Sequence, residues 1–274
     1  MTENCTDKND IKKPWHQNLL IMLPLIVFIF SIISFIFKEI EFQNEQNIND
    51  YNNLGIILQK LIVLPRENFD LMQKYKNDPT LSSEVSGSLR IENGLLLNQA
   101  NTILKRIPPK FVTPYDYYIV GHFYFLNQQY PESINMLNKA ISYREPLEIV
   151  IRSMLVKSIA LAFIDYHKGN EYFGQTIEYL KIIGHENKTL DYCYPQITYA
   201  ETRWTNLEIM LGHYEKAQKH LNIAKSYYAK INKFSGQQDS LKPTLIFLQD
   251  LINKIDDNNF QINQSQLKKL KKIF

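Results

Sequence analysis

One uninterrupted apolar run limits the folds open to this chain more than any other feature. Leu19–Phe37 holds nineteen residues without a charge, and its polar members are Ser31 and Ser34. A helix of about 20 such residues spans the hydrocarbon layer of a membrane. A cleaved secretory signal has a shorter apolar region, of about 7–15 residues, that ends in small residues. Because this run ends in aromatic and aliphatic residues before Lys38, the sequence predicts one uncleaved N-terminal transmembrane helix.

The basic residues beside this run predict its orientation. Lys8, Lys12 and Lys13 precede it, whereas the next basic residue after Lys38 is Lys60. Lysine and arginine in short flanking segments stay on the cytoplasmic side of a membrane. We therefore expect a single-pass inner-membrane protein with a cytoplasmic N-terminus and an extracytoplasmic body, which is periplasmic in a bacterium.

Composition favours an all-α body and excludes several classes of protein. Glycine accounts for 9 of 274 residues, less than half of the usual share of about 7%, and folds with many tight turns need more. The two cysteines, Cys5 and Cys193, are too few for a disulfide scaffold or a cysteine-built zinc site. The net charge is +3, and four lysines cluster close to Phe274. The rest of the chain is near neutral, so no nucleic-acid binding is predicted.

Apolar residues after the run recur at helical spacing. A linker rich in Asn and Gln is followed by an apolar face, Leu54–Ile62, which we expect Pro65 to close. A later helix is expected to end at Ile107, because Pro108 cannot continue it. Short connections of this kind join antiparallel helices. The body is therefore predicted to consist of packed helix pairs.

The segment Pro114–Pro146 carries the clearest motif. Two predicted helices meet at Asn127–Gln129, and their apolar and small residues recur at fixed positions. These residues are Tyr117, Val120, Gly121 and Tyr124 on the first helix, and Tyr130, Ser133, Ile134, Leu137, Ala140 and Ile141 on the second. The pattern resembles the tetratricopeptide repeat (TPR), in which small residues mark the close approach of two helices.

Weaker echoes of the motif occur on both sides of this segment. Leu211–Ala217 looks like the turn and second helix of another repeat, and Gly169–Glu171 looks like a further turn. Upstream, Leu97–Ile107 matches a second helix whose partner is poorly defined. The fold class expected from the resemblance is all-α, with the transmembrane helix followed by an α-solenoid of about four TPR-like helix pairs.

The predicted organisation follows the chain in six parts. They are a short cytoplasmic flank (1–18), the transmembrane helix (19–37), a linker (38–53), a helical lead-in (54–79), the TPR-like solenoid (80–232) and C-terminal capping helices with a basic tail (241–274). The lysines of the tail fit either a terminal cap or a contact with an anionic membrane surface.

The resemblance also points to a binding surface. Tyr115, Tyr118, His122 and Phe125 lie one position away from the packing residues of the motif. In the TPR family this spacing lines the concave groove, so the resemblance implies that these side chains contact a peptide or a partner helix. The alternative is that they pack against the preceding helix pair.

A search for chemistry identifies no catalytic, cofactor-binding or metal-binding residues. The six histidines have no close metal-ligand spacing, and no phosphate-binding or nucleophile motif occurs. Cys193 lies near a helix start, where a reactive thiol is conceivable, although packed cysteines are commoner.

The leading hypothesis is therefore a membrane-anchored scaffold or accessory factor, without enzymatic activity, that binds a protein partner. It would act in an inner-membrane assembly such as a translocon, a secretion or pilus machine, or a maturation complex. An envelope enzyme, for example a peptidoglycan-active hydrolase, and a small-ligand sensor are the alternatives. The sequence leaves the oligomeric state open.

Overall fold

The computed structural model of the chain is all-helical in the part that it describes, residues 15–256 without 76, 187–189 and 232–236. It confirms the all-α class, and no strand occurs in these residues. The elements are α1 (Trp15–Lys74), α2 (Pro79–Arg106), the 3₁₀ turn η1 (Pro109–Phe111), α3 (Pro114–Leu126), α4 (Tyr130–Ser142), α5 (Leu147–Ile164), α6 (Tyr166–Glu186), α7 (Leu190–Met210), α8 (Tyr214–Tyr228) and α9 (Gln237–Asp256). The basic tail of the predicted cap falls in residues 257–274, outside the described residues.

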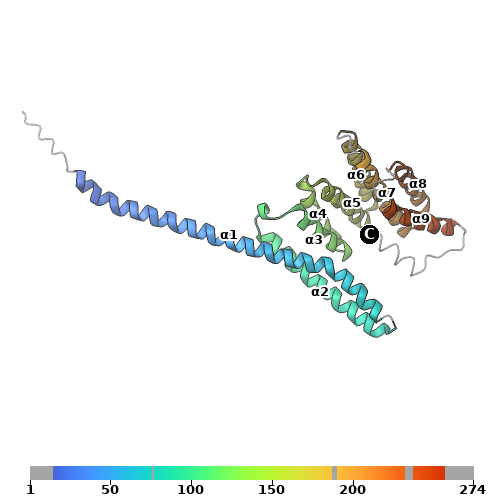
Figure 1. Ribbon diagram of the computed structural model, residues 1–274, viewed down its shortest axis with the longest axis horizontal. Coiled ribbons are helices and arrows are strands. Elements are labelled where there is room, and N and C mark those ends of the chain that lie inside the picture. The colour runs from blue at the N-terminus through green and yellow to red at the C-terminus, as the bar shows by residue number, and fades with distance from the viewer. Residues whose placement is uncertain (1–14, 76, 187–189, 232–236, 257–274) are drawn as a thin grey trace, which may run out of the picture.

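Helix α1 is a single element of 60 residues whose first part extends away from the body as an arm (Figure 1). The expected linker at 38–53 and the expected stop at Pro65 are both wrong, because the helix continues through them. A proline inside a helix costs about 3 kcal/mol. Leu54, Leu61 and Leu64, each at most 5% exposed, precede Pro65 in the helix, and the apolar surface that they bury offsets this cost.

The arm carries an apolar surface that no other described part of the chain covers. Phe28, Phe30, Phe35 and Phe37 are each 63–70% exposed. Among the described residues, no helix combines the length and the apolar character needed to cross a membrane. Of the predicted span Leu19–Phe37, the side chains of residues 19–26 lie outside the described residues.

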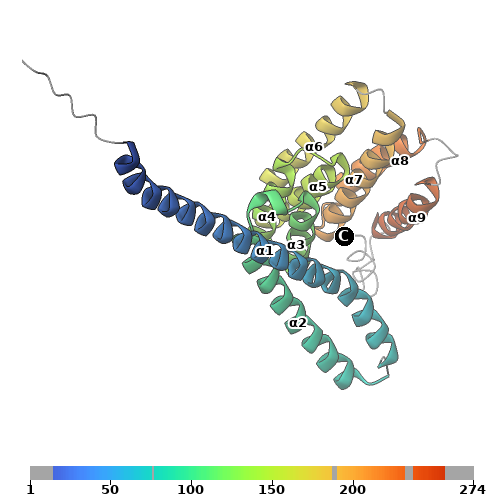
Figure 2. The same cartoon turned by 60° about the vertical axis from the view of Figure 1, so that its left-hand side comes forward.

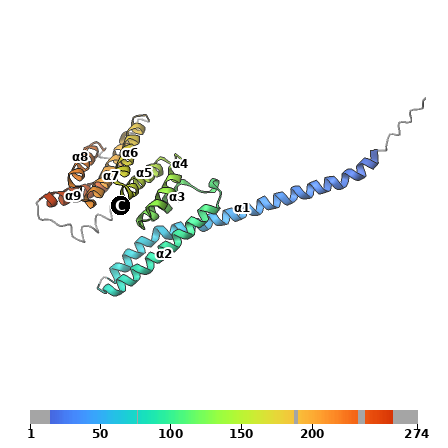
Figure 3. The same ribbon diagram turned by 180° about the vertical axis from the view of Figure 1, so that it is seen from behind.

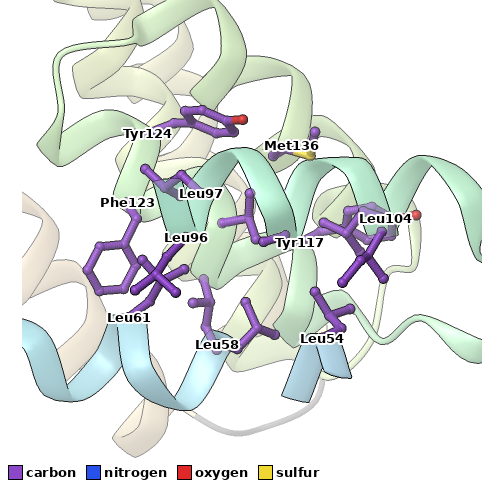
Figure 4. Packing of buried hydrophobic residues seen from close by; sticks show 14 of the residues in the cluster. Leu54, Leu58, Leu61, Leu96, Leu97, Leu104, Tyr117, Phe123, Tyr124 and Met136 are labelled. Atoms are coloured by element: carbon purple, nitrogen blue, oxygen red, sulfur yellow. The ribbon is translucent and has the colours of Figure 1, made fainter. Parts of the chain in front are cut away.

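The C-terminal part of α1 packs antiparallel against α2 and provides the partner that the sequence left undefined (Figure 3). Leucines from both helices meet aromatic residues of α3 in one core cluster, shown in Figure 4. Its labelled members include Leu54, Leu58 and Leu61 of α1, Leu96, Leu97 and Leu104 of α2, and Tyr117 and Phe123 of α3. An ion pair between Asp50 and Arg106 joins α1 to the end of α2. The predicted lead-in is therefore half of a helical hairpin.

The remaining helices form the hairpins α3/α4, α5/α6 and α7/α8, followed by α9 (Figure 2). The first helices contact one another in series, α3 with α5, α5 with α7, and α7 with α9. Each second helix, α4, α6 or α8, packs against the first helix of the next unit. This succession is compatible with a helical repeat fold.

Local sequence signals account for the hairpin ends. Thr113 and Asp116 form a reciprocal capping box at the start of α3, with Pro114 in the first turn. The predicted turn Asn127–Gln129 is confirmed, and Gln128 adopts a positive φ of 61° there. The predicted turn at Gly212 is also confirmed, with φ 79°. Both positions use the left-handed conformation that ends a helix sharply.

Two glycines mark close approaches between helices. A Cβ at Gly121 would lie 2.9 Å from Cγ of Leu137, which explains the small residue of the motif. A Cβ at Gly169 would lie 2.4 Å from the backbone nitrogen of Ala162 on α5. The expected turn at Gly169–Glu171 is therefore wrong. The chain turns at Asp165, whose carboxylate accepts hydrogen bonds from the first amides of α6.

Helix α7 lies between α5, α6, α8 and α9, and residues 201–209 are buried on every side. Burial of two carboxylates in this stretch requires partners. Glu208 accepts hydrogen bonds from the Tyr166 hydroxyl (2.7 Å) and from Nε1 of Trp204 (2.9 Å), and its other oxygen lies 2.8 Å from Nδ1 of His213. Glu201 pairs with His220 at 2.7 Å. His213 at the N-cap of α8 and His220 within α8 thus contact the two buried carboxylates and have structural roles.

Candidate binding face on the first helices

The four residues of the predicted groove do not share one environment. Tyr115 is 49% exposed, whereas Tyr118 and His122 are half-buried. Phe125 is 6% exposed and belongs to the core cluster shared by α5, α6 and α7. Its ring lies 6.3 Å from that of Phe163 on α5. The structure therefore places three of the four side chains at the surface or its edge and one in the core.

Tyr118 and His122 meet residues that the sequence did not single out. The Arg152 guanidinium of α5 lies within hydrogen-bonding reach of the Tyr118 hydroxyl. On α7, Nη1 of Arg203 donates a hydrogen bond of 2.7 Å to the Tyr199 hydroxyl. We call Tyr118, His122, Arg152, Tyr199 and Arg203 the aromatic–arginine cluster. It joins the three first helices α3, α5 and α7.

Ring contacts hold the α3 part of the cluster. The rings of Tyr118 and His122 stack with centroids 5.7 Å apart, and Tyr115 lies 6.4 Å from Tyr118 on its exposed side. On α7, the Arg203 guanidinium lies over the Tyr199 ring at 5.4 Å, a cation–π contact. Tyr118 and Tyr199 pack against the same core cluster. The rings thus lie beside two guanidiniums, that of the buried Arg203 and that of the half-exposed Arg152.

The cluster is positively charged at neutral pH. Burial lowers the pKa of His122 to about 4, and the positive charges of Arg203 and Arg152 act in the same direction. The imidazole is therefore neutral, and its Nδ1 is buried without a hydrogen-bond partner among the described residues. Burial also raises the pKa of Tyr118, while the two arginines oppose that rise. The charges of both arginines thus affect the pKa values of Tyr118 and His122.

The lowered pKa of His122 predicts that folding stability depends on pH. An unfolded histidine takes up its proton near pH 6.5 and the folded one only near pH 4, so the unfolded state binds more protons between these values. Folding stability therefore falls as the pH drops, by about 2 kcal/mol at pH 4.5. We expect His122→Phe, which keeps a ring, to remove this loss. Urea unfolding of the wild type and of His122→Phe at pH 7 and pH 4.5 measures this loss of stability. An equal loss in the two proteins would contradict its assignment to His122.

A separate recess lies away from this cluster. It has a volume of about 610 Å³ and is bounded by α1, α2 and the end of α3. Its polar lining is mostly asparagine and serine, and Arg90 supplies its charged group. Because arginine and aromatic side chains of α3, α5 and α7 meet at the aromatic–arginine cluster, and half of the Arg152 side chain is exposed there, we take the cluster as the candidate site.

The described residues hold no metal-binding group of three His, Cys, Asp or Glu side chains. Cys193 is 1% exposed, within α7. The histidines at 16 and 185 lie outside the residues whose side chains are described.

Comparison with known proteins yields no relative: no protein-family model, no curated protein and no solved structure matches this chain. The fold defines the class instead. The protein is an all-helical assembly of packed hairpins, compatible with a helical repeat fold.

Proposed function

We propose that this chain is a membrane-anchored, TPR-like scaffold that binds a protein partner on the face formed by α3, α5 and α7. The observation that carries the proposal is the aromatic–arginine cluster, which three successive first helices build together. Stacked hairpins present such a face as a long surface suited to an extended peptide or a helix. Large rigid rings and arginine are the side chains that dominate binding energies at protein interfaces.

The TPR-like part of the proposal rests on packing as well as on the motif. Gly121 stands where α3 and α4 come closest, against Leu137, as the small residue of the repeat requires. Ala140 is fully buried in the first core cluster. The order of contacts between the first and second helices is also that of stacked repeats.

The membrane part rests on the run Leu19–Phe37 and on its exposed phenylalanines. Apolar side chains that water surrounds on a projecting helix are costly, and a lipid layer would cover them. The lysines at 8, 12 and 13 favour a cytoplasmic N-terminus. The proposed location is thus the inner membrane, with the helical body outside the cytoplasm.

Site-specific photocrosslinking of the full chain in cells tests this function. A photoreactive residue at Tyr115, beside Tyr118, is expected to give a partner adduct in the membrane fraction. The matched control is Asn138, an exposed residue of α4 in the other helix layer, which should give several-fold less adduct. Equal adducts at both sites would contradict the choice of face, and adducts found only in the soluble fraction would contradict the anchor.

A further inference from the structure

Two arginines bring positive charge to the aromatic–arginine cluster from different helices. Arg152 and Arg203 bring two fixed positive charges to one patch, and arginine stays protonated under all physiological conditions. His122 adds no charge at neutral pH, as derived above. A negative charge lies beside Arg152, where Oε1 of Glu148 is 2.8 Å from Nη2 of the arginine. The positive charges of both arginines reach Tyr118 and His122, and a positive field of this kind favours an anionic ligand.

The contact of Glu148 with Arg152 is one that a ligand can replace. It lies one helical turn before Arg152, and the two side chains are 54% and 50% exposed. Exposed pairs at this spacing contribute little to stability. A carboxylate from a ligand can contact the guanidinium in place of Glu148, so the exchange costs little. Glu148 is thus a weak internal competitor for Arg152.

We infer that the aromatic–arginine cluster binds an acidic side chain of a peptide segment, with Arg152 as the exchangeable anchor and Glu148 as its competitor in the unbound protein. This inference rests on the proposed function and names the chemistry of the partner. The rings of Tyr118 and Tyr199 flank the anchor and supply flat apolar contacts for the residues beside the acidic one. Arg203, which is 3% exposed, adds a fixed charge that water screens weakly.

The test uses the purified full chain in detergent and a displayed library of random decapeptides. We expect the selected peptides to be enriched in Asp or Glu at one position. One selected peptide is then synthesised, together with its Gln or Asn counterpart, and its affinity is measured by fluorescence anisotropy. Glu148→Gln removes the competitor and should tighten binding about two- to fivefold, whereas Arg152→Gln should weaken it by about fivefold or more.

Opposite changes from two neighbouring exposed residues cannot come from misfolding. Equal affinities for the wild type and both variants would overturn the inference, as would selection of peptides without acidic enrichment. Binding to vesicles with anionic lipid that matches or exceeds peptide binding would also overturn it. A partner adduct at Tyr115 combined with any of these results leaves the proposed function standing, whereas acidic-peptide binding without an adduct overturns the cellular function alone.

Discussion

Gly169→Ala is expected to destabilise the protein by about 3 kcal/mol or more. The new Cβ would lie 2.4–2.5 Å from the backbone N and Cα of Ala162. These are atoms of a buried helix that cannot rotate away as a flexible side chain would, so α5 and α6 must separate. Overpacking of this kind costs about 1–3 kcal/mol against movable side chains and more against backbone. Urea or thermal unfolding measures the loss.

Gly174→Ala in the same helix provides the matched control. A Cβ there meets nothing within 4 Å, and alanine favours a helix over glycine by about 0.5–1 kcal/mol. The control is therefore expected to be neutral or slightly stabilising. Gly169→Ala and Gly174→Ala should differ by about 4 kcal/mol, and similar stabilities would show that α5 and α6 are farther apart than described.

Glu208→Leu is expected to destabilise the protein by about 3–5 kcal/mol, because it removes the central member of a buried network. The Glu208 side chain is fully buried, and it joins Tyr166 of α6, Trp204 of α7 and His213 at the start of α8. Leucine fills a similar volume but accepts no hydrogen bond, so the buried Nε1 of Trp204 and the half-buried Tyr166 hydroxyl lose their partner. Loss of cooperativity in the unfolding of α6–α8 should accompany the change.

Tyr166→Phe tests how much the Tyr166 hydroxyl alone contributes to this network. It removes the hydroxyl that donates to Glu208 and accepts from Lys216, and it leaves the Trp204 and His213 contacts in place. A single hydrogen bond of this kind contributes about 1–1.5 kcal/mol. An effect of Glu208→Leu no larger than that of Tyr166→Phe would argue against a cooperative network.

The hairpin α3/α4 was predictable because its signals are local. Pro114 and the capping box set the start of α3, and Gly121 faces α4 in the register of the motif. The continuity of α1 was not predictable in this way. Pro65 is a local stop signal, and only the burial of leucines against α2 and α3, which are distant in the sequence, outweighs it.

The candidate site was half predictable for the same reason. Tyr118 and His122 lie in the motif, but Arg152 lies on a helix that is apolar on almost every side, Leu147–Ile164. Such a helix has no amphipathic register from which to place one arginine. Gly169 shows the reverse error, since glycine also serves close backbone approach, and only the packed structure distinguishes that use from a turn.

The unbroken helix α1 gives the proposed anchor a geometric meaning. From Phe37 to Asp50, where the ion pair with Arg106 fixes α1 to the body, the chain advances about 20 Å at 1.5 Å per residue. The length of such a helix sets the distance of the helical body from the lipid. It also sets the direction that the body faces, since each residue turns the chain by about 100°. The arm would therefore determine both how far from the lipid the aromatic–arginine cluster stands and which neighbours in the membrane plane it faces.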